Sequence, residues 1–147
     1  MKYLKVNPEV CIGCQACSEA CAELFFKEKS IEKSCIRIVE SVASLVPNDK
    51  EKGFDIIVCN QCGKCIPLCP TQALSVNSVG VVMLVKKDCS GCLICVAECP
   101  CGCMHYLVEE NAPFKCTACG VCVKKCPVNA LEIVNQVGTH LCCPIKE

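Results

Sequence analysis

The chain has 147 residues and carries 15 basic and 15 acidic side chains, so its formal net charge is zero. This balance lacks the basic excess typical of nucleic-acid-binding proteins, and no nucleic-acid partner is expected. The chain holds 21 cysteines but only four Phe, two Tyr and no Trp. Small cysteine-rich folds with few aromatic residues are generally held together by disulfides or by metals.

The first six residues, MKYLKV, contain no apolar secretory segment, and the odd cysteine count excludes complete disulfide pairing. No apolar stretch approaches the ~20 residues needed to span a bilayer, so no membrane span is expected. These observations favour a cytoplasmic protein whose cysteines bind metal.

In chain order, the apolar pattern predicts short strands at residues 4–6, 54–58, 73–76, 81–85 and 131–134. Residues 18–29 predict a longer amphipathic helix, and Asn77 to Gly80 predict a hairpin turn between two of the strands. Residues 35–39 also have a strand-like pattern. We therefore expect a unit of strand, cysteine loop, short helix and strand that is repeated four times.

The repeat is the cysteine pattern C-x2-C-x2-C-x3-C, which occurs four times and is followed by Pro in three of the four copies. Three thiolates at this spacing can bind three irons of one 4Fe–4S cluster, and the fourth binds the other cluster of a pair. Structural zinc sites generally use two cysteine pairs separated by a longer span, so zinc is disfavoured. The sequence predicts four 4Fe–4S clusters and sixteen ligands: Cys11, Cys14, Cys17, Cys21, Cys59, Cys62, Cys65, Cys69, Cys89, Cys92, Cys95, Cys99, Cys116, Cys119, Cys122 and Cys126.

Other chemistry-bearing residues lie outside the four motifs. Cys35 is interpreted as a buried thiol, whereas Cys101 and Cys103 are interpreted as buried thiols with substitute ligation as the alternative. A role in partner contact, or no role, is expected for Cys142 and Cys143, and a structural role for His105 and His140. No nucleotide-binding or P-loop motif is present, so no catalytic residue is predicted.

The motifs could pair sequentially, one with two and three with four, or they could nest, with two and three inside one and four. The lengths of the intervening segments suit either arrangement. The predicted hairpin over residues 73–85 joins motifs two and three directly and favours nesting.

The motifs resemble those of bacterial two-cluster ferredoxins, doubled. Over residues 3–134 the chain is similar to the four-cluster subunits of dimethyl-sulfoxide reductases, formate dehydrogenases and hydrogenases. This resemblance rests on VNPEVCIGC at residues 6–14, CPTQAL at 69–74, KCTAC at 115–119 and CVKKCPVNAL at 122–131. It implies an α+β fold of two ferredoxin-like modules, the outer one formed by residues 1–58 and 107–134 and the inner one by 59–106, with a tail at 135–147.

The resemblance also implies nested ligand sets. These sets are Cys11, Cys14, Cys17 and Cys126; Cys116, Cys119, Cys122 and Cys21; Cys59, Cys62, Cys65 and Cys99; and Cys89, Cys92, Cys95 and Cys69.

The function implied is electron transfer between a catalytic oxidoreductase subunit and another redox partner, such as a ferredoxin or a flavin-containing subunit. A tungsten or molybdenum aldehyde oxidoreductase is the favoured catalytic partner, beside formate dehydrogenase, carbon monoxide dehydrogenase and hydrogenase. A free polyferredoxin that serves several enzymes is the alternative, and a redox sensor or assembly module is a third class. The basic pairs at residues 86–87 and 124–125 are expected to be solvated surface or to steer an acidic partner.

Overall fold

The computed structural model describes residues 1–41 and 53–135. The strands in this part of the chain form three separate two-stranded antiparallel sheets. β1 (Lys2–Val6) pairs with β6 (Leu131–Asn135), β2 (Arg37–Glu40) with β3 (Phe54–Ile57), and β4 (Leu74–Val76) with β5 (Val82–Leu84). The α-helices are α1 (Ala16–Phe26), α2 (Ile94–Ala97) and α3 (Val121–Lys125). Short 3-10 turns η1 (Pro8–Val10), η2 (Ile31–Lys33) and η4 (Lys86–Asp88) complete the elements, and the predicted α+β class is confirmed.

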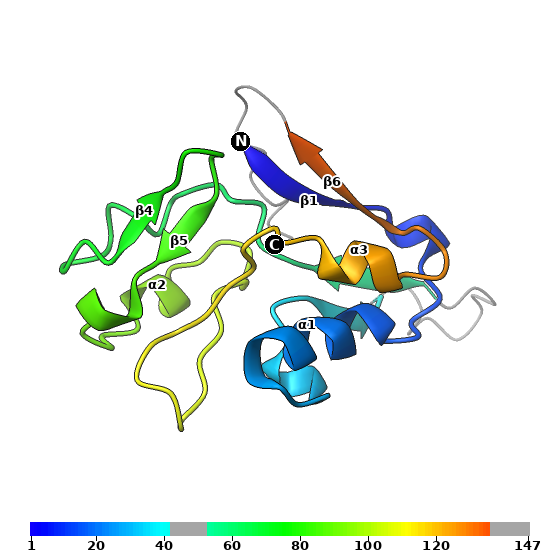
Figure 1. Cartoon of the computed structure of the whole chain (residues 1–147), viewed down its shortest axis with the longest axis horizontal. Helices are drawn as coiled ribbons and strands as arrows, with labels where there is room; N and C mark the ends of the chain where they lie inside the picture. The colour runs from blue at the N-terminus through cyan, green and yellow to red at the C-terminus, as the bar shows by residue number, and fades with distance from the viewer. Residues whose placement is uncertain (42–52, 136–147) are drawn as a thin grey trace.

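The first and last described strands lie side by side, so the two ends of the described chain form one unit. The register runs from Lys2 opposite Asn135 to Val6 opposite Leu131. α1, which contains part of motif one, packs against α3, which contains part of motif four. Figure 1 shows β1, β6, α1 and α3 in the same half of the molecule.

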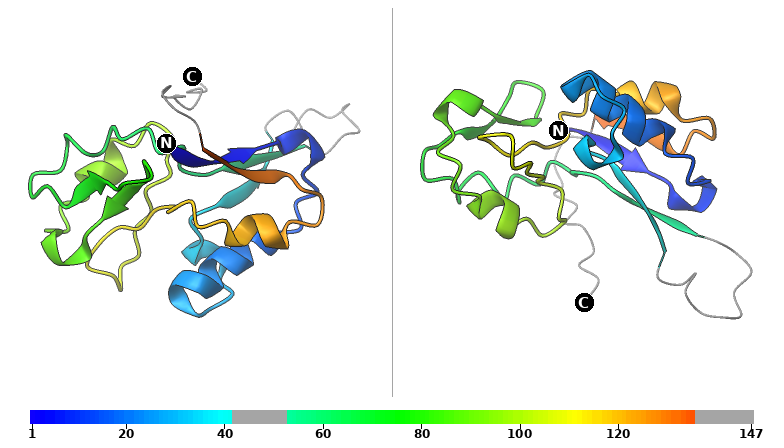
Figure 2. Two further views of the ribbon diagram at one scale, coloured as in Figure 1. Left: turned by 45° about the horizontal axis from the view of Figure 1, so that its top comes forward. Right: turned by 90° about the horizontal axis from the view of Figure 1, so that it is seen from below.

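The β4–β5 hairpin and α2 lie together in the other half, as both views of Figure 2 also show. The predicted hairpin turn is confirmed. Gly80 N–H donates to the Asn77 carbonyl (3.0 Å), and Asn77 N–H donates to the Val81 carbonyl (2.9 Å). The Asn77 side chain accepts from the N–H of Val79 and of Val81, which fixes the turn. Motifs two and three are therefore linked by a tight local connection.

Two apolar cores correspond to these two halves. The larger core joins Leu4 of β1 and Leu131 of β6 to Ile36, Ile38 and Phe114. The smaller core joins Leu74 of β4 and Val82 of β5 to Met104. Cysteines of the motifs are part of both cores, so the predicted ligands occupy positions that larger apolar side chains would fill in an ordinary domain.

The long helix differs from its predicted bounds of 18–29. It begins at Ala16, and it ends at Phe26 because Lys27 adopts a left-handed conformation and donates its N–H to the Glu23 carbonyl. Its apolar side chains are also not confined to one face, since Leu24 and Phe25 are exposed.

The prediction of a strand, loop, helix and strand unit repeated four times is wrong at motif two. A helix there would need a bond from residue 67 to the Gly63 carbonyl, and Pro67 has no N–H to donate. Ile66 N–H bonds that carbonyl instead (3.0 Å), giving a turn. Between motifs three and four, the described residues form only the single bridge between His105 and Phe114 in place of two strands.

None of the helices in the described residues is long and apolar enough to cross a membrane.

Candidate metal centres

Each cysteine motif contains two residues in the left-handed region, at its third and fifth positions. These residues are Gly13 and Gln15, Gln61 and Gly63, Gly91 and Leu93, and Ala118 and Gly120. Such alternation turns successive backbone N–H groups toward one side of a loop, which creates a concavity suited to anions and iron–sulfur sites. The local backbone therefore repeats four times, although the secondary structure around it does not.

In motifs two, three and four, the third residue donates its N–H to the sulfur of the first cysteine. The bond runs from Gln61 to Cys59 (3.4 Å) and from Ala118 to Cys116 (3.3 Å). The same bond joins Gly91 N–H to the sulfur of Cys89 (3.4 Å). Hydrogen bonds to ligand sulfurs are one means by which a protein sets the potential of a cluster.

The fourth cysteine accepts a different hydrogen bond. In motifs two, three and four a Pro follows it, the third residue after it is left-handed, and the fourth residue after it donates N–H to its sulfur. These bonds measure 3.3 Å at Cys69, 3.4 Å at Cys99 and 3.2 Å at Cys126. The same local geometry therefore recurs at the fourth cysteine of three motifs.

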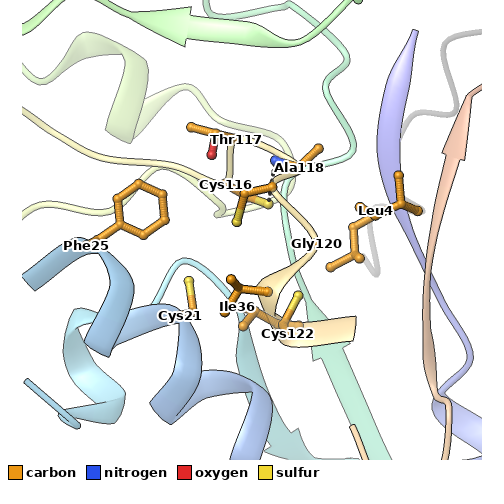
Figure 3. Close-up of a pocket in the computed structure, with 12 residues that line it drawn as sticks. Leu4, Cys21, Phe25, Ile36, Cys116, Thr117, Ala118, Gly120 and Cys122 are labelled. Atoms are coloured by element: carbon orange, nitrogen blue, oxygen red, sulfur yellow. Dashed lines mark hydrogen bonds between the residues drawn. The ribbon is translucent and has the colours of Figure 1, made fainter. Parts of the chain in front are cut away.

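One cavity is lined by Cys21 of α1 together with Cys116, Cys119 and Cys122 of motif four. It contains about 330 Å³ of empty space, part of it open to solvent. In Figure 3 the sulfurs of Cys21, Cys116 and Cys122 face a common space between α1 and the loop that leads into α3. Leu4 of β1 and Ile36 form part of the apolar wall.

A second cavity, with about 310 Å³ of empty space that is partly open to solvent, has the reciprocal composition. Three of its cysteines, Cys11, Cys14 and Cys17, come from motif one, and the fourth, Cys126, comes from motif four. Ile38 of β2 and Ile56 of β3 contribute to its wall. The β2–β3 sheet therefore forms part of the wall of this site.

A third cavity, with about 360 Å³ of empty space that is partly open to solvent, lies in the other half of the molecule. Its lining cysteines are Cys59, Cys62 and Cys65 of motif two and Cys99 of motif three, with Cys101 and Cys103 beside them. Two lysines also line it: Lys64, which is exposed, and Lys115, which is buried.

The remaining four predicted ligands gather around Cys95 of α2. Burial raises the pKa of the Cys95 thiol, and the neighbouring Cys89, Cys92 and Cys69 raise it further. The four groups of cysteines are those that the nested prediction requires. The cluster that each cysteine binds stays a prediction.

The pKa values of the motif cysteines suit a cofactor whose positive metal ions stabilise thiolates. Burial raises the pKa of Cys116 and Cys122 to about 12, so these thiols remain protonated at neutral pH without metal. The hydrogen bond from the Cys35 side chain lowers the pKa of Cys21 to about 6, against the opposing effect of burial. Because cysteine must ionise to bind metal, iron binding releases protons from these sites.

Among the described residues, no three His, Cys, Asp or Glu side chains converge closely enough to hold one metal ion. The four cysteines of each cavity instead surround a volume, and each cavity includes at least one cysteine whose sulfur accepts a backbone N–H. Thiolates around an apolar cavity with such donors are the usual environment of a 4Fe–4S cluster. The residues present fit that group.

A buried lysine and a buried glutamine connect the two halves. The Nζ of Lys115 donates to Gln61 Oε1 (2.8 Å), the Val82 carbonyl (2.8 Å) and the Cys116 carbonyl (2.9 Å). Gln61 Nε2 donates to the same Cys116 carbonyl (2.9 Å), while its Oε1 also accepts from Val82 N–H (3.0 Å). The two side chains thereby join motif two and β5 to motif four.

Sequence reasoning missed both residues of this connection. The available signals were a lysine directly before motif four, and a glutamine at a motif position occupied by Gly or Ala in the other copies. Neither signal predicts burial, which depends on the packing of one half of the molecule against the other.

Some of the cysteines and histidines outside the four motifs lie within the described residues. Cys35 and Cys103 are buried, as expected. Cys101 is only half-buried and is disulfide-bonded, so the expectation of a buried free thiol is wrong at that position. The Cys103 thiol donates to the Cys101 carbonyl (3.0 Å). His105 is buried and accepts a hydrogen bond at Nδ1 from Arg37 Nε (3.3 Å), in agreement with a structural role. Cys142, Cys143 and His140 lie outside the described residues, as does almost all of the predicted tail.

Comparison with known proteins identifies the same segments. Two family profiles, each described as a 4Fe–4S binding domain, match the chain, one at residues 113–132 and the other at residues 8–24 and 58–72. One of the chains of the polysulfide reductase of Wolinella succinogenes is 36% identical over 105 residues, which are 67% of this chain and 53% of that protein.

Two Salmonella proteins are also similar. A tetrathionate reductase subunit of Salmonella typhimurium is 30% identical over 95 residues (61% of this chain, 36% of that protein). The thiosulfate reductase electron transfer subunit PhsB of Salmonella typhi is 32% identical over 104 residues (67% of this chain, 53% of that protein). The chain thus spans about a third to a half of the length of these relatives. With its cysteine motifs and the matching profiles, this protein belongs to the ferredoxin-like iron–sulfur proteins that bind 4Fe–4S clusters.

Proposed function

We propose that this protein is an electron-transfer subunit that holds four 4Fe–4S clusters and connects a catalytic oxidoreductase subunit to a second redox partner. The observation that carries the proposal is the grouping of the sixteen motif cysteines. Three of the groups line cavities that each combine three cysteines of one motif with one of another. When bound, such clusters supply one-electron carriers.

The positions of the four cysteine groups support an arrangement of the four proposed clusters in a single row. The pKa of the Cys122 thiol is raised mainly by burial, and charge on Cys17 raises it further. The cysteine group that contains Cys17 therefore lies beside the group that contains Cys122. Charge on Cys59 likewise raises the pKa of the Cys116 thiol, so the group that contains Cys59 lies beside the group that contains Cys116. Cys65, Cys99, Cys69 and Cys95 meet in the smaller core. We therefore propose a row that begins with the set containing Cys11 and ends with the set containing Cys89.

The nested modules are part of the same proposal. β1 and β6 pair motif one with motif four, and the β4–β5 hairpin joins motif two to motif three. This supports an outer module formed by residues 1–58 and 107–134 around an inner module formed by residues 59–106.

The catalytic partner is proposed by class. The relatives carry the names of components of polysulfide, tetrathionate and thiosulfate reductases, and one is the beta subunit of a phenylglyoxylate dehydrogenase from Aromatoleum evansii. The resemblance seen in the sequence favours a tungsten or molybdenum aldehyde oxidoreductase. Both support a separate catalytic subunit. The chain's own residues hold and shield the redox groups and perform no substrate chemistry.

The experiment is anaerobic purification of the full chain from its native host, followed by identification of whatever co-purifies. We expect about sixteen irons and about sixteen acid-labile sulfides per chain, four of each for every proposed cluster. A catalytic oxidoreductase subunit in constant ratio supports the subunit proposal. Recovery of the chain alone, reducible by several enzymes, would instead support a free polyferredoxin. Stoichiometric zinc, or iron near about half the expected amount, contradicts the cluster content.

A further inference from the structure

Lys115 places a buried positive charge between two of the cysteine groups. The side chain is 5% exposed, and the glutamine that it contacts, Gln61, is 2% exposed. Neither of the two ion pairs found among the described residues includes Lys115. A buried charge is costly unless it is paired or fully hydrogen-bonded. The position therefore needs an explanation beyond ordinary surface solvation.

The hydrogen bonds identify the side chain as an ammonium. Its three partners, Gln61 Oε1, the Val82 carbonyl and the Cys116 carbonyl, are all acceptors at 2.8–2.9 Å. An ammonium has three hydrogens to donate, whereas a neutral amine would turn its lone pair toward one of these oxygens. The orientation of the Gln61 amide agrees, because its Oε1 faces two donors.

The ammonium adjoins both neighbouring groups of cysteines. Lys115 lines the cavity that contains Cys59, Cys62, Cys65 and Cys99. It also precedes Cys116 in the chain and bonds its carbonyl. Gln61 extends the connection, because its backbone N–H donates to the sulfur of Cys59 and its side-chain Nε2 donates to the Cys116 carbonyl. No other described lysine is buried.

We propose that Lys115 is a fixed counter-charge that raises the reduction potentials of the two clusters in the middle of the row, and that Gln61 positions it. This inference rests on the proposed function, since it takes the two cysteine groups as cluster ligands. A reduced cluster carries one more negative charge than an oxidised one, so a nearby cation stabilises the reduced form. The effect is large only where water is excluded, because burial weakens dielectric screening.

The test is a redox titration of the fully loaded chain, followed by electron paramagnetic resonance, with Lys115→Met as the variant. Met keeps most of the volume of the side chain and removes the charge. At a fixed applied potential near their midpoints, we expect at least a tenfold fall in the ratio of reduced to oxidised form for two of the four clusters. For a one-electron couple this is a downward shift of about 59 mV. The other two clusters should shift by less.

Lys64→Met is the matched control. Lys64 lines the same cavity and lies between two of its cysteines, but it is exposed. Water and salt screen an exposed charge, so its removal should change the same ratio less than threefold. Variants that replace one cysteine of each middle group, Cys62→Ser and Cys119→Ser, identify which signals come from those groups.

Gln61→Glu is a second variant that keeps the lysine and adds a negative charge beside it. It should lower the same two potentials, and it replaces Lys115→Met if that variant loads incompletely. Wild-type potentials for the two middle clusters in a fully loaded variant would overturn the proposal, as would equal shifts in all four. Wild-type protein with fewer than four cluster signals would instead contradict the proposed function, so the two failures are distinguishable.

Discussion

The backbone N–H of Cys35 donates a hydrogen bond to the sulfur of Cys21, 14 residues earlier in the chain (3.4 Å). In the other three motifs the corresponding donor is four residues after the fourth cysteine. Motif one has no Pro after Cys21, so α1 continues to Phe26 and the local donor is absent. The segment leading into β2 supplies the missing bond.

The first prediction concerns the Cys35 thiol. Cys35 is fully buried, and its hydrogen bond to Cys21 is the largest cause of the lowered pKa of Cys21. Cys35→Ala keeps the backbone N–H but removes this second donor. A hydrogen bond of about 0.5–1.5 kcal/mol corresponds to roughly 20–60 mV, and a thiol is a weak donor, so one of the four potentials should fall by an amount near the lower end.

Cys103→Ala is the control for this change. Cys103 is equally buried, but its thiol donates to the Cys101 carbonyl and to no predicted ligand sulfur. Its backbone N–H, which donates to the Cys99 sulfur, is kept in the variant. A smaller shift is expected for it in the same redox titration. Equal shifts for the two variants would show that the loss of buried volume is responsible.

The second prediction tests the nested ligand sets. Cys126→Ala and Cys14→Ala should abolish the same paramagnetic signal, because both cysteines line one cavity. Cys92→Ala should abolish a different signal. Cys14 and Cys92 are matched, since each is the exposed second cysteine of its motif. Loss of a common signal in the Cys126 and Cys92 variants would establish sequential pairing instead.

The third prediction concerns Gly13, which has a φ of +69° and faces the ring of Phe54. In Gly13→Ala the left-handed conformation costs about 1–2 kcal/mol, and the Cβ collides with that ring, which typically adds about 1–3 kcal/mol. Gly102→Ala is the control, because Gly102 has a φ of +57° and nothing within 4 Å of the added Cβ.

The thermal stabilities of the two variants can be compared by heating each one and following the visible absorbance of its clusters. The Gly13 variant should lose its absorbance at a lower temperature than the Gly102 variant. Identical profiles would mean that Phe54 moves aside without penalty.

The fourth prediction is a pH dependence that comes from His105. Burial and the Arg37 guanidinium lower the pKa of His105 to about 4, from a usual 6.5. The folded protein therefore holds a neutral imidazole, and unfolding allows it to take up a proton below pH 6.5. This contribution to stability is complete above the unfolded pKa and decreases as the pH falls toward 4, by at most about 1.4 kcal/mol per pH unit.

Unfolding rates of the loaded protein should therefore rise between pH 6.5 and pH 4.5 more steeply in the wild type than in His105→Gln. Titration of the cysteines changes the unfolding rates of both proteins. The difference between their pH dependences therefore gives the contribution of His105. His140→Gln, which changes the only other histidine of the chain, controls for the substitution itself. Parallel curves for wild type and His105→Gln would contradict the prediction.

The fifth prediction concerns docking. Lys124 and Lys125 are exposed on α3, next to predicted ligands Cys122 and Cys126. If they steer an acidic partner, Lys124→Gln with Lys125→Gln should slow electron delivery from the co-purifying subunit more at low salt than at high salt. Lys86→Gln should have less effect, since Lys86 is already paired with Glu110 (3.1 Å). A rate that does not depend on ionic strength would remove these lysines from the interface.

Much of the local structure was predictable. The Asn77–Gly80 turn was evident because Asn and Gly there are followed by an apolar run, and the turn chemistry is local. The bounds of α1 were less predictable, because Lys27 ends the helix by adopting a left-handed conformation that its residue type does not favour. The absence of the predicted helix in motif two could have been foreseen from the sequence, because Pro67 has no N–H for the first hydrogen bond of that helix.

The sequence by itself determined that the chemistry is that of iron–sulfur clusters, because four motifs repeat the cysteine spacing that binds a 4Fe–4S cluster. Only the tertiary structure showed that cysteines of motifs one and four line common cavities, since this depends on β1 meeting β6 across 125 or more residues. It also decided that Lys115 is buried between two groups. Burial of a charge depends on which surfaces exclude water, and no local pattern around residue 115 encodes the packing of the two halves.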